Sequence, residues 1–158
     1  MRKWILSLVM TLLLVPCVCC AEPVITSDTR TFDVMKGIYD LRGHVFVQFP
    51  VHDSTMTITG DKTQVYMYQM EVHGAGNITL SFDDMHFSCD KVDVYHKERT
   101  AYLAGRMKFK SNDVSITSNK GSYCWKTKLA TFIGNVKVNG QPRPDNTKYN
   151  METKQFVP

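Results

Sequence analysis

The stretch Ile116-Thr117-Ser118-Asn119 is followed by Gly134-Asn135-Val136-Lys137-Val138, and 15 residues separate Asn119 from Gly134. The same two-part unit occurs three more times upstream, each with the same interval from its Asp to its Gly. These copies are Ile25-Thr26-Ser27-Asp28 with Gly43-His44-Val45-Phe46-Val47, Ile58-Thr59-Gly60-Asp61 with Gly76-Asn77-Ile78-Thr79-Leu80, and Phe87-Ser88-Cys89-Asp90 with Gly105-Arg106-Met107-Lys108-Phe109. Successive anchor residues, the Asp or Asn of each unit, lie 33, 29 and 29 positions apart. A fixed period of this length indicates a repeat architecture.

Apolar and polar residues alternate within each unit, which is the pattern of a half-buried strand. In the last unit Phe132, Val136 and Val138 share the parity of Gly134, and the equivalent positions of the other units are also apolar. Beyond each anchor the apolar positions resume with the opposite parity, which predicts a bulge or bend there. Each unit is therefore predicted to be two strands with a corner at the anchor and a turn near residues 97–99 or 126–128. Four such units would stack into a curved all-β structure with an apolar interior.

The chain of 158 residues is long enough for one domain with a core. Arg2 and Lys3 precede an apolar run from Trp4 to Val15, and a short segment then ends at Ala21. This order is typical of a signal peptide over residues 1–21, cleaved after Ala21. A retained membrane anchor and a lipoprotein signal are the alternatives, because the run is near the minimum for a bilayer span and cysteines follow it. We predict a β-domain over residues 22–140 and a flexible C-terminal tail over residues 141–158.

The charge and the cysteines restrict the classes of function. Removing Arg2 and Lys3 from the 19 basic residues leaves 17, against 15 acidic residues, and the basic residues form no stripe. Nucleic acid is therefore not expected as a partner.

Only Cys89 and Cys124 lie beyond the predicted cleavage site. Their offset of six residues in the repeat register corresponds to about 20 Å along a strand, so both are expected to be free thiols unless a turn brings them together.

No pattern of catalytic residues occurs in the sequence. A nucleophile elbow, a phosphate-binding loop and paired zinc-binding cysteines are all missing, and the five histidines lack the spacing of metal ligands. The group formed by Asp83, Asp84 and His86 lies between two units and is interpreted as an acidic turn. We therefore expect no enzyme activity, no catalytic residue, no metal site and no cofactor.

The unit Ile-Thr-x-Asp followed by Gly-Asn-Val-x-Val resembles the OstA-like (LptA) family of periplasmic lipopolysaccharide transport. The resemblance covers residues 24–139, and Gly134-Asn135-Val136-Lys137-Val138 is its clearest match. Arg106 departs from the pattern at the Asn position, and Gly60 and Cys89 replace the small residue, commonly Ala, before the anchor. The resemblance implies an antiparallel β-jellyroll, a twisted β-roll of four two-strand repeats of about 29 residues, whose apolar groove holds lipid acyl chains.

The resemblance also implies partners and a location. Lipopolysaccharide would be carried from the inner to the outer membrane through the periplasm, with the acyl chains of lipid A in the groove. Edge strands would pair with LptC-like domains at the inner membrane, with LptD-like domains at the outer membrane, and possibly head-to-tail with further copies of this chain. Two alternatives stay open: a membrane-anchored LptC-like component, and a structural β-solenoid interaction module with a closed core and no lipid.

The candidate lipid-binding residues are apolar residues on the predicted inward face of the units. They are Ile58, Val72, Ile78, Leu80, Phe87, Leu103, Met107, Phe109, Ile116, Phe132, Val136 and Val138. Among them Leu103, Met107, Phe109 and Ile116, from the middle repeats, are the favoured lining. Residue types alone favour side chains that only pack against one another in a closed sandwich, and it is the resemblance that favours the lipid-binding interpretation.

Overall fold

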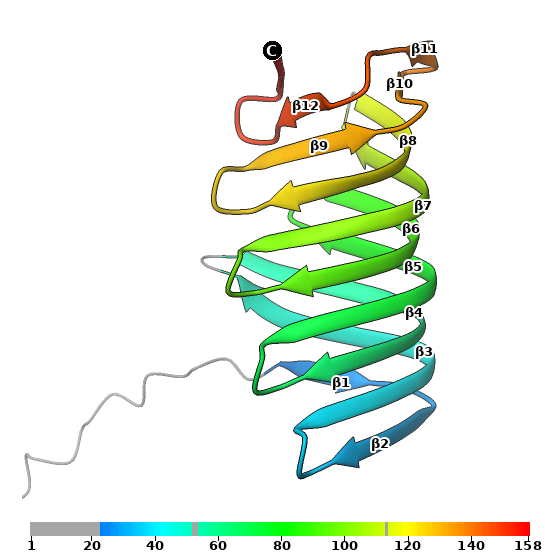
Figure 1. Cartoon of the computed structure of the whole chain (residues 1–158), viewed down its shortest axis with the longest axis vertical. Coiled ribbons are helices and arrows are strands. Elements are labelled where there is room, and N and C mark those ends of the chain that lie inside the picture. The colour runs from blue at the N-terminus through cyan, green and yellow to red at the C-terminus, as the bar shows by residue number, and fades with distance from the viewer. Residues whose placement is uncertain (1–22, 52–53, 113) are drawn as a thin grey trace, which may run out of the picture.

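The computed structural model describes residues 23–51, 54–112 and 114–158. Within these residues the chain forms one 13-stranded sheet whose neighbouring strands pair antiparallel (Figure 1). The central strands are β3 (Ile38–Val51), β4 (Ser54–Tyr66), β5 (Glu71–Phe82), β6 (Met85–Tyr95), β7 (Thr100–Ser111) and β8 (Val114–Cys124). Shorter strands flank them: β1 (Val24–Thr26), β2 (Thr29–Asp33), β9 (Leu129–Ile133), β10 (Lys137–Val138), β11 (Gln141–Pro142), β12 (Thr147–Asn150) and β13 (Gln155–Val157). The predicted all-β fold class is confirmed.

Each long strand bends sharply in its middle, and the bends follow one side of the molecule, on the right in Figure 1. The register of every long pair shifts at this point, for example between Ala104 and Met107 on β7. Gly105 and Arg106 there have φ angles of +79° and +45°. Glycine adopts this left-handed conformation without the steric cost of a Cβ atom. The bend predicted at the anchor residues is present, but the extra residue of the bulge lies opposite the anchor, where the corner glycine and the residue after it are both left-handed.

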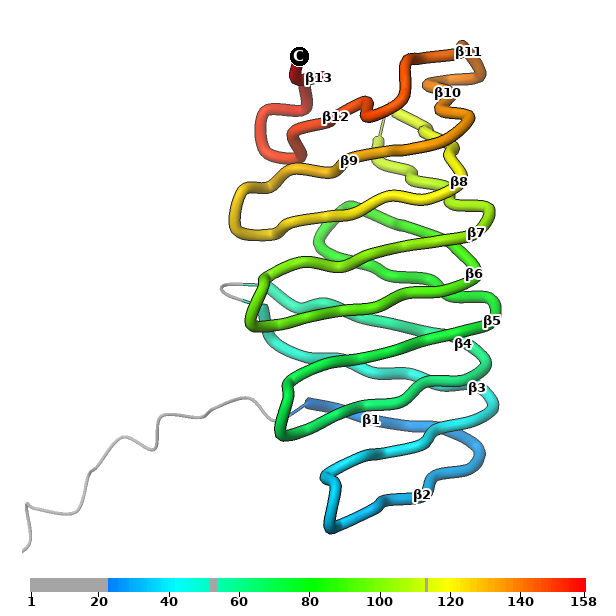
Figure 2. The backbone as a smooth tube through the Cα atoms, viewed as in Figure 1, coloured from blue at the N-terminus to red at the C-terminus, as the bar shows by residue number. Residues whose placement is uncertain are grey.

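The bends divide the sheet into two half-sheets that face each other. The front half-sheet in Figure 1 contains β2, β9, β12 and the part of each long strand nearer the turns at residues 67–70, 96–99 and 125–128. The back half-sheet contains β1, β10 and the other part of each long strand. Figure 2 shows the backbone running alternately through the front and the back layer from the N-terminal to the C-terminal end of the molecule.

Side chains from both half-sheets fill the space between them. The ring of Phe109 on the back layer lies 5.8 Å from that of Phe132 on the front layer, measured between centroids. Small front residues admit side chains from the back. A Cβ atom on Gly74 would lie 2.9 Å from Ile78 Cδ1, and one on Gly121 would lie 2.7 Å from Met107 Sδ. The apolar face predicted from alternation therefore forms one continuous core.

The C-terminal end of the sheet differs from the sequence prediction. The predicted flexible tail over residues 141–158 instead contributes β11, β12 and β13. Strand β12 pairs with β9, and Tyr149 and Met151 are only 3% and 8% exposed. These two side chains cover the last apolar part of the core, which explains why the segment is ordered. The unit ending at Val138 is thus not the terminal edge, because β11 and β12 extend the sheet beyond it.

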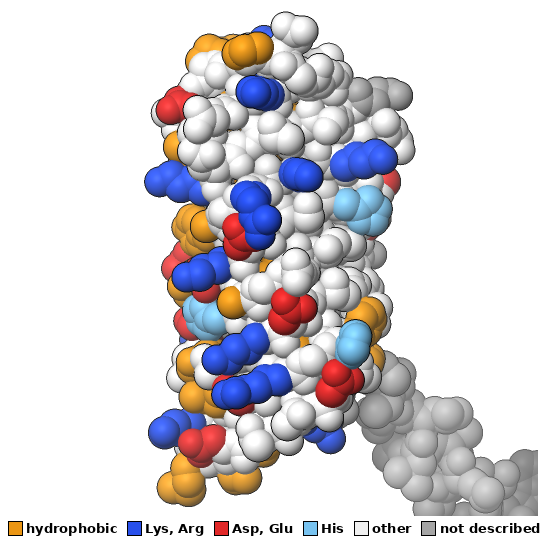
Figure 3. Space-filling model, turned by 90° about the vertical axis from the view of Figure 1, so that its right-hand side faces the viewer, with side chains coloured by type: hydrophobic (Ala, Val, Ile, Leu, Met, Phe, Trp, Pro, Cys, Tyr) orange, Lys and Arg blue, Asp and Glu red, His pale blue; other side chains and the backbone are white. Residues whose placement is uncertain are grey.

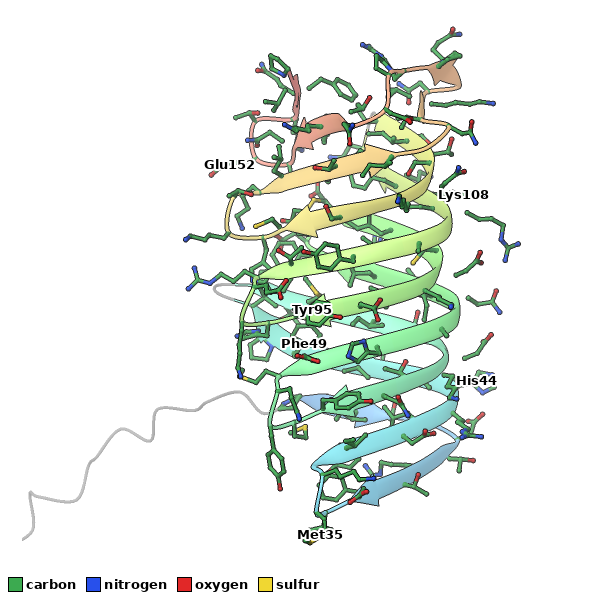
Figure 4. All side chains as sticks on the ribbon, viewed as in Figure 1. Met35, His44, Phe49, Tyr95, Lys108 and Glu152 are labelled. Carbon is green, nitrogen blue, oxygen red and sulfur yellow. The ribbon has the colours of Figure 1, made fainter. Side chains whose placement is uncertain are left out.

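The N-terminal end remains open. Strands β1 and β2 pair only with β3 within the described residues, so their outer edges have no neighbour there. Exposed apolar side chains gather at this end, with Phe32 43%, Val34 68% and Met35 90% exposed. Met35 lies at its tip in Figure 4, and Figure 3 shows hydrophobic side chains at the same end.

No described helix is long and apolar enough to cross a bilayer. The predicted signal peptide, residues 1–21, lies outside the described residues.

Candidate functional site

An apolar cavity of about 480 Å³ opens between the two half-sheets near the N-terminal end. A volume of this size is within the range of small-molecule sites. Its lining comes from the back part of β3, from the front parts of β4, β5 and β6, from the turns that follow β4 and β6, and from Pro23 before β1. The lining residues are Pro23, Val47, Phe49, Pro50, Val65, Tyr66, Met67, Met70, Glu71, Val72, Val94 and His96.

The cavity lies between the front and back layers, toward the turn ends of the strands. Its front wall is a cross-strand row of valines, with Val65 opposite Val72 and Val72 opposite Val94. Its back wall contains Val47 and Phe49, which alternate along β3 and so point to the same side. The lining residues lie toward the turn ends of their strands, on the side of the layers away from the corners. The arrangement suits an elongated apolar group that enters from the open side.

The turn at residues 67–70 forms part of the mouth and is unusually apolar. Met67 and Met70 line the cavity and are 38% and 49% exposed, and the neighbouring Tyr68 is 65% exposed. The turns at residues 96–99 and 125–128 are mostly polar or charged, whereas the turn at residues 34–37 also exposes Val34 and Met35. Methionine adapts its shape to variable apolar ligands. The two methionines of the turn at residues 67–70 are the sequence signal that pointed to the mouth, and sequence reasoning missed it.

Most of the predicted lipid-binding residues lie in the packed core and not along the cavity. All twelve are buried, with exposures from 0% to 8%, and belong to the single core cluster. Only Val72 also lines the cavity. The favoured residues Leu103, Met107, Phe109 and Ile116 are packed between the layers at 0% or 1% exposure. The structure therefore brings the predicted set together as a core and places the accessible apolar surface nearer the N-terminal end.

Aromatic rings fill the interior beyond the cavity. The row of cavity valines continues across the front layer through Ala101 to Tyr123. The ring of Tyr123 reaches the back layer, where its centroid lies 5.9 Å from that of Phe82 and 5.8 Å from that of Phe87. Phe109 continues this contact at 4.9 Å from Phe87. These rings close the space between the layers at the level of β5 to β8.

Two hydroxyl groups in this interior have no hydrogen-bond partner among the described residues. They are Thr63 Oγ1 and Tyr123 Oη, and both side chains are 0% exposed. Burial raises the pKa of Tyr123 well above its ordinary value, so this hydroxyl stays protonated. Buried hydroxyls are usually paired, because losing hydration without a replacement bond is costly. Thr63 and Tyr123 are therefore exceptions to this rule among the described residues.

The opposite side of the molecule, along the corners, is polar (Figure 3). In each unit the residue after the corner glycine reaches back 16 positions to the anchor side chain. His44 Nδ1 lies 2.7 Å from Asp28 Oδ2, Asn77 donates to Asp61 at 2.8 Å, and Asn135 donates to Asn119 at 3.4 Å. Arg106 forms the same link to Asp90 with Nη2 at 2.6 Å. The departure of Arg106 from the sequence pattern thus preserves the contact.

These links also shift protonation equilibria. The hydrogen bond from Arg106 lowers the pKa of Asp90, and the hydrogen bond to Asp28 raises the pKa of His44. Both sites are on the surface, and Figure 4 shows His44 projecting from the corner side. The corner side chains thus tie one another in place along the closed side of the roll.

Cys89 and Cys124, the two cysteines of the described residues, are free thiols, as the register predicts. Cys89 is 4% exposed, and burial raises its pKa to about 11. Burial alone would raise the pKa of Cys124, but hydrogen bonds from Thr127 and other neighbours outweigh it and lower that pKa. In the described residues no three His, Cys, Asp or Glu side chains are grouped closely enough to hold a metal ion.

Comparison with known proteins gives a match in structure. No protein-family model and no curated protein matches the sequence. Among solved structures, the chain is similar to LptH of Pseudomonas aeruginosa, described as the LptA-homologous periplasmic component of the conserved lipopolysaccharide transport device. The TM-score is 0.63 at 13% sequence identity, and the match covers 87% of this chain and 94% of that one. The resemblance inferred from the four Asp-to-Gly units is thus confirmed at the level of the fold: this chain has the β-jellyroll of an LptA homologue.

Proposed function

We propose that this protein is a non-catalytic periplasmic carrier that holds acyl chains of lipopolysaccharide and bridges the inner and outer membranes. The observation that supports the proposal most directly is the apolar cavity between the half-sheets, in a fold shared with LptH. Export by a cleaved signal peptide over residues 1–21 is part of the proposal. Lipid transport of this kind needs no chemical step, so it requires no catalytic group.

The energetic need for such a cavity is large. Burying one methylene group contributes about 0.8 kcal/mol, so an acyl chain of about 12 carbons in water costs on the order of 10 kcal/mol. A cavity lined by Val47, Phe49, Val65 and Val72 offers that chain an apolar surface. The predicted lining residues Ile58 and Leu80 extend the row of Val47 across β4 and β5. They would be the first core residues to meet a chain that penetrates further.

The sheet edges supply the proposed bridging contacts. Strands β1 and β2 form the N-terminal edge of the described sheet, and β11 and β13 form its C-terminal edge. Phe156 and Val157 on β13 are 37% and 39% exposed, and Phe32 on β2 is 43% exposed. Exposed edges with apolar side chains are suited to strand addition by another β-domain. LptC-like and LptD-like domains, or a second copy of this chain, are the proposed partners.

A closed-core interaction module without lipid is the second candidate. The specific observation in its favour is that eleven of the twelve predicted lining residues are packed in the core and do not line the cavity. A membrane-anchored LptC-like component is a further alternative, and it depends on residues 1–21. Sequencing the mature N-terminus tests it, since a chain that begins at Glu22 would exclude the anchor.

Photo-crosslinking in cells tests the carrier function. A photoreactive amino acid is placed at Phe49 or Val72 in the cavity, at Leu103 or Ile116 in the packed core, and at Tyr102 or Lys108 on the outer face. We expect lipopolysaccharide adducts from the cavity positions, fewer adducts from the core positions, and none from the outer positions. Labelling confined to the outer positions would refute the carrier function, and labelling from none would favour the closed-core module.

A further inference from the structure

The turns of the front half-sheet form one continuous row along the open side of the roll, on the left in Figure 1. Among the described residues they are five turns of four residues, at 34–37, 67–70, 96–99, 125–128 and 151–154. The first residue of each later turn donates its backbone N–H to the last residue of the turn before it, as Met67 does to Gly37 at 2.9 Å. That last residue is left-handed in every turn, with φ angles from +55° to +65°. The five turns therefore present their equivalent positions in the same way.

The row changes in chemistry along its length. The second residue of the first two turns, called here the apolar turns, is Met35 or Tyr68, and these are 90% and 65% exposed. The next two turns, called the cationic turns, have an exposed Lys97 or Lys126 at this position. The last turn has Glu152, which lies at the opposite end of the row from Met35 in Figure 4. Apolar tips at the N-terminal end are thus followed directly by cationic tips.

The apolar turns form a single patch at the mouth of the cavity. Val34 and Met70 extend the patch, with 68% and 49% of each residue exposed. Tyr68 joins the two turns, because its hydroxyl donates to the Val34 carbonyl at 3.3 Å and its ring covers Gly37. Met67 and Met70 line the cavity, so the patch continues into the interior. Exposed apolar side chains gathered in this way indicate a contact surface.

The cationic turns supply positive charge beside this patch. They contain four basic residues and one carboxylate, Glu98. The basic residues are Lys97, Arg99, Lys126 and Lys128. Among the described residues, none of these four side chains forms a salt bridge. Cations without a counter-ion in the protein are suited to an anionic surface.

We propose that this row of turns docks on the surface of a lipid bilayer that contains anionic phospholipids. The apolar turns would insert among the headgroups, and the cationic turns would lie over the anionic ones. Apolar and aromatic side chains next to lysines are the features that hold a protein at a bilayer interface. A β-domain that adds a strand needs a free strand edge, whereas these turns are already bonded to one another along the row.

Docking in this orientation would place the mouth of the cavity at the bilayer surface. The membrane contact goes beyond the proposed function, and the inference rests on that function only for one step, the passage of an acyl chain from the bilayer into the cavity. Met67 and Met70, which belong to both the patch and the cavity lining, would be the first residues on this path.

Sedimentation with lipid vesicles tests the membrane contact. The protein is recovered from the periplasmic fraction and its N-terminus is sequenced, so that residues 1–21 do not contribute to binding. Vesicles of phosphatidylcholine alone are compared with vesicles that also contain phosphatidylglycerol, and neither kind contains lipopolysaccharide. We expect binding to the anionic vesicles, and weaker binding as salt is raised, because salt screens the lysines from the headgroups.

Two pairs of substitutions separate the apolar from the cationic contribution. Val34→Ser with Met35→Ser removes apolar tips and should weaken binding to anionic vesicles by about tenfold or more. Its control is Val24→Ser on β1, where Val24 is 49% exposed and distant from the turns in Figure 1.

Lys97→Gln with Lys126→Gln should weaken binding about 25-fold, at about fivefold for each lysine. Its control, Lys108→Gln with Lys110→Gln, removes two exposed lysines from the outer face of the back layer. Both controls should retain most of the wild-type binding, and circular dichroism melting curves confirm that each variant is folded.

Equal binding to the two kinds of vesicle, or an equal loss in test and control variants, would overturn the membrane contact. Absence of binding to either kind would also overturn it and would leave the apolar turns to a protein partner. None of these results bears on the carrier function, because crosslinking of lipopolysaccharide from Phe49 and Val72 in cells measures that function separately.

Discussion

Replacing the corner glycine Gly105 with alanine tests whether the Asp-to-Gly unit determines the fold through direct contact at the corner. Gly105 has a φ angle of +79°, which alanine adopts only at a cost. A Cβ atom there would also lie 2.8 Å from Asp90 Cβ and 2.9 Å from Asp90 Cγ. The anchor side chain would have to move, and its hydrogen bonds with Arg106 would be disturbed.

The magnitude follows from these two terms. The left-handed conformation costs an alanine about 1 kcal/mol relative to glycine, and overpacking against Asp90 adds about 2 kcal/mol. Gly140 separates the terms, because its φ angle is +83° while no atom lies within 4 Å of a Cβ built on it. Gly140→Ala is therefore expected to cost only about 1 kcal/mol.

Thermal unfolding followed by far-ultraviolet circular dichroism measures the difference. For a domain of this size 1 kcal/mol corresponds to about 3 °C, so Gly105→Ala should lower the melting temperature by about 9 °C and Gly140→Ala by about 3 °C. Chemical denaturation should give the same order. If the two variants melt at the same temperature, contact between the corner and the anchor does not contribute, and the reasoning from the repeat fails.

Three further predictions concern protonation and the interior. The contact of His44 with Asp28 raises the His44 pKa. The stability lost in His44→Ala should therefore be greatest near pH 6 and decrease toward pH 8, as His44 deprotonates. Melting curves at both pH values check this, and a constant difference would contradict it. Tyr123→Phe should stabilise the unliganded protein by about 1 kcal/mol, measured by urea unfolding, because it removes a buried unpaired hydroxyl. A loss of stability would indicate that this hydroxyl has a partner. Iodoacetamide at pH 8 should modify Cys124 and leave Cys89 unmodified until the protein unfolds, because the two thiols differ in burial and pKa. Mass spectrometry measures the labelling of each cysteine, and equal labelling would contradict this difference.

The corner was predictable because its causes are local in the repeat. The interval from Asp90 to Gly105 and the change of parity beyond the anchor together required a bend. The bonding role of Arg106 was not predictable from the consensus Asn. An arginine in the left-handed position still reaches the anchor carboxylate, and this depends on the geometry of the bend.

The C-terminal segment illustrates the opposite case. Residues 141–158 have no regular alternation and are rich in turn-forming residues. Their order comes from contacts distant in the sequence, with Tyr149 packed 6.0 Å from Phe109 between ring centroids. A sequence pattern reports local periodicity, so it does not reveal a short strand that is held by a core made elsewhere.

The sequence by itself determined the strand content, the inward face and the corners, because alternation and glycine spacing act within a single unit. Only the tertiary structure decided which apolar residues are accessible. Leu103 and Phe132 have the same pattern as Val72, yet the aromatic rings of Phe82, Phe87 and Tyr123 close the interior on one side, whereas the layers remain apart at Val72. The physical reason is that filling the space between two half-sheets depends on the summed side-chain volumes from both layers, and no single strand carries that information.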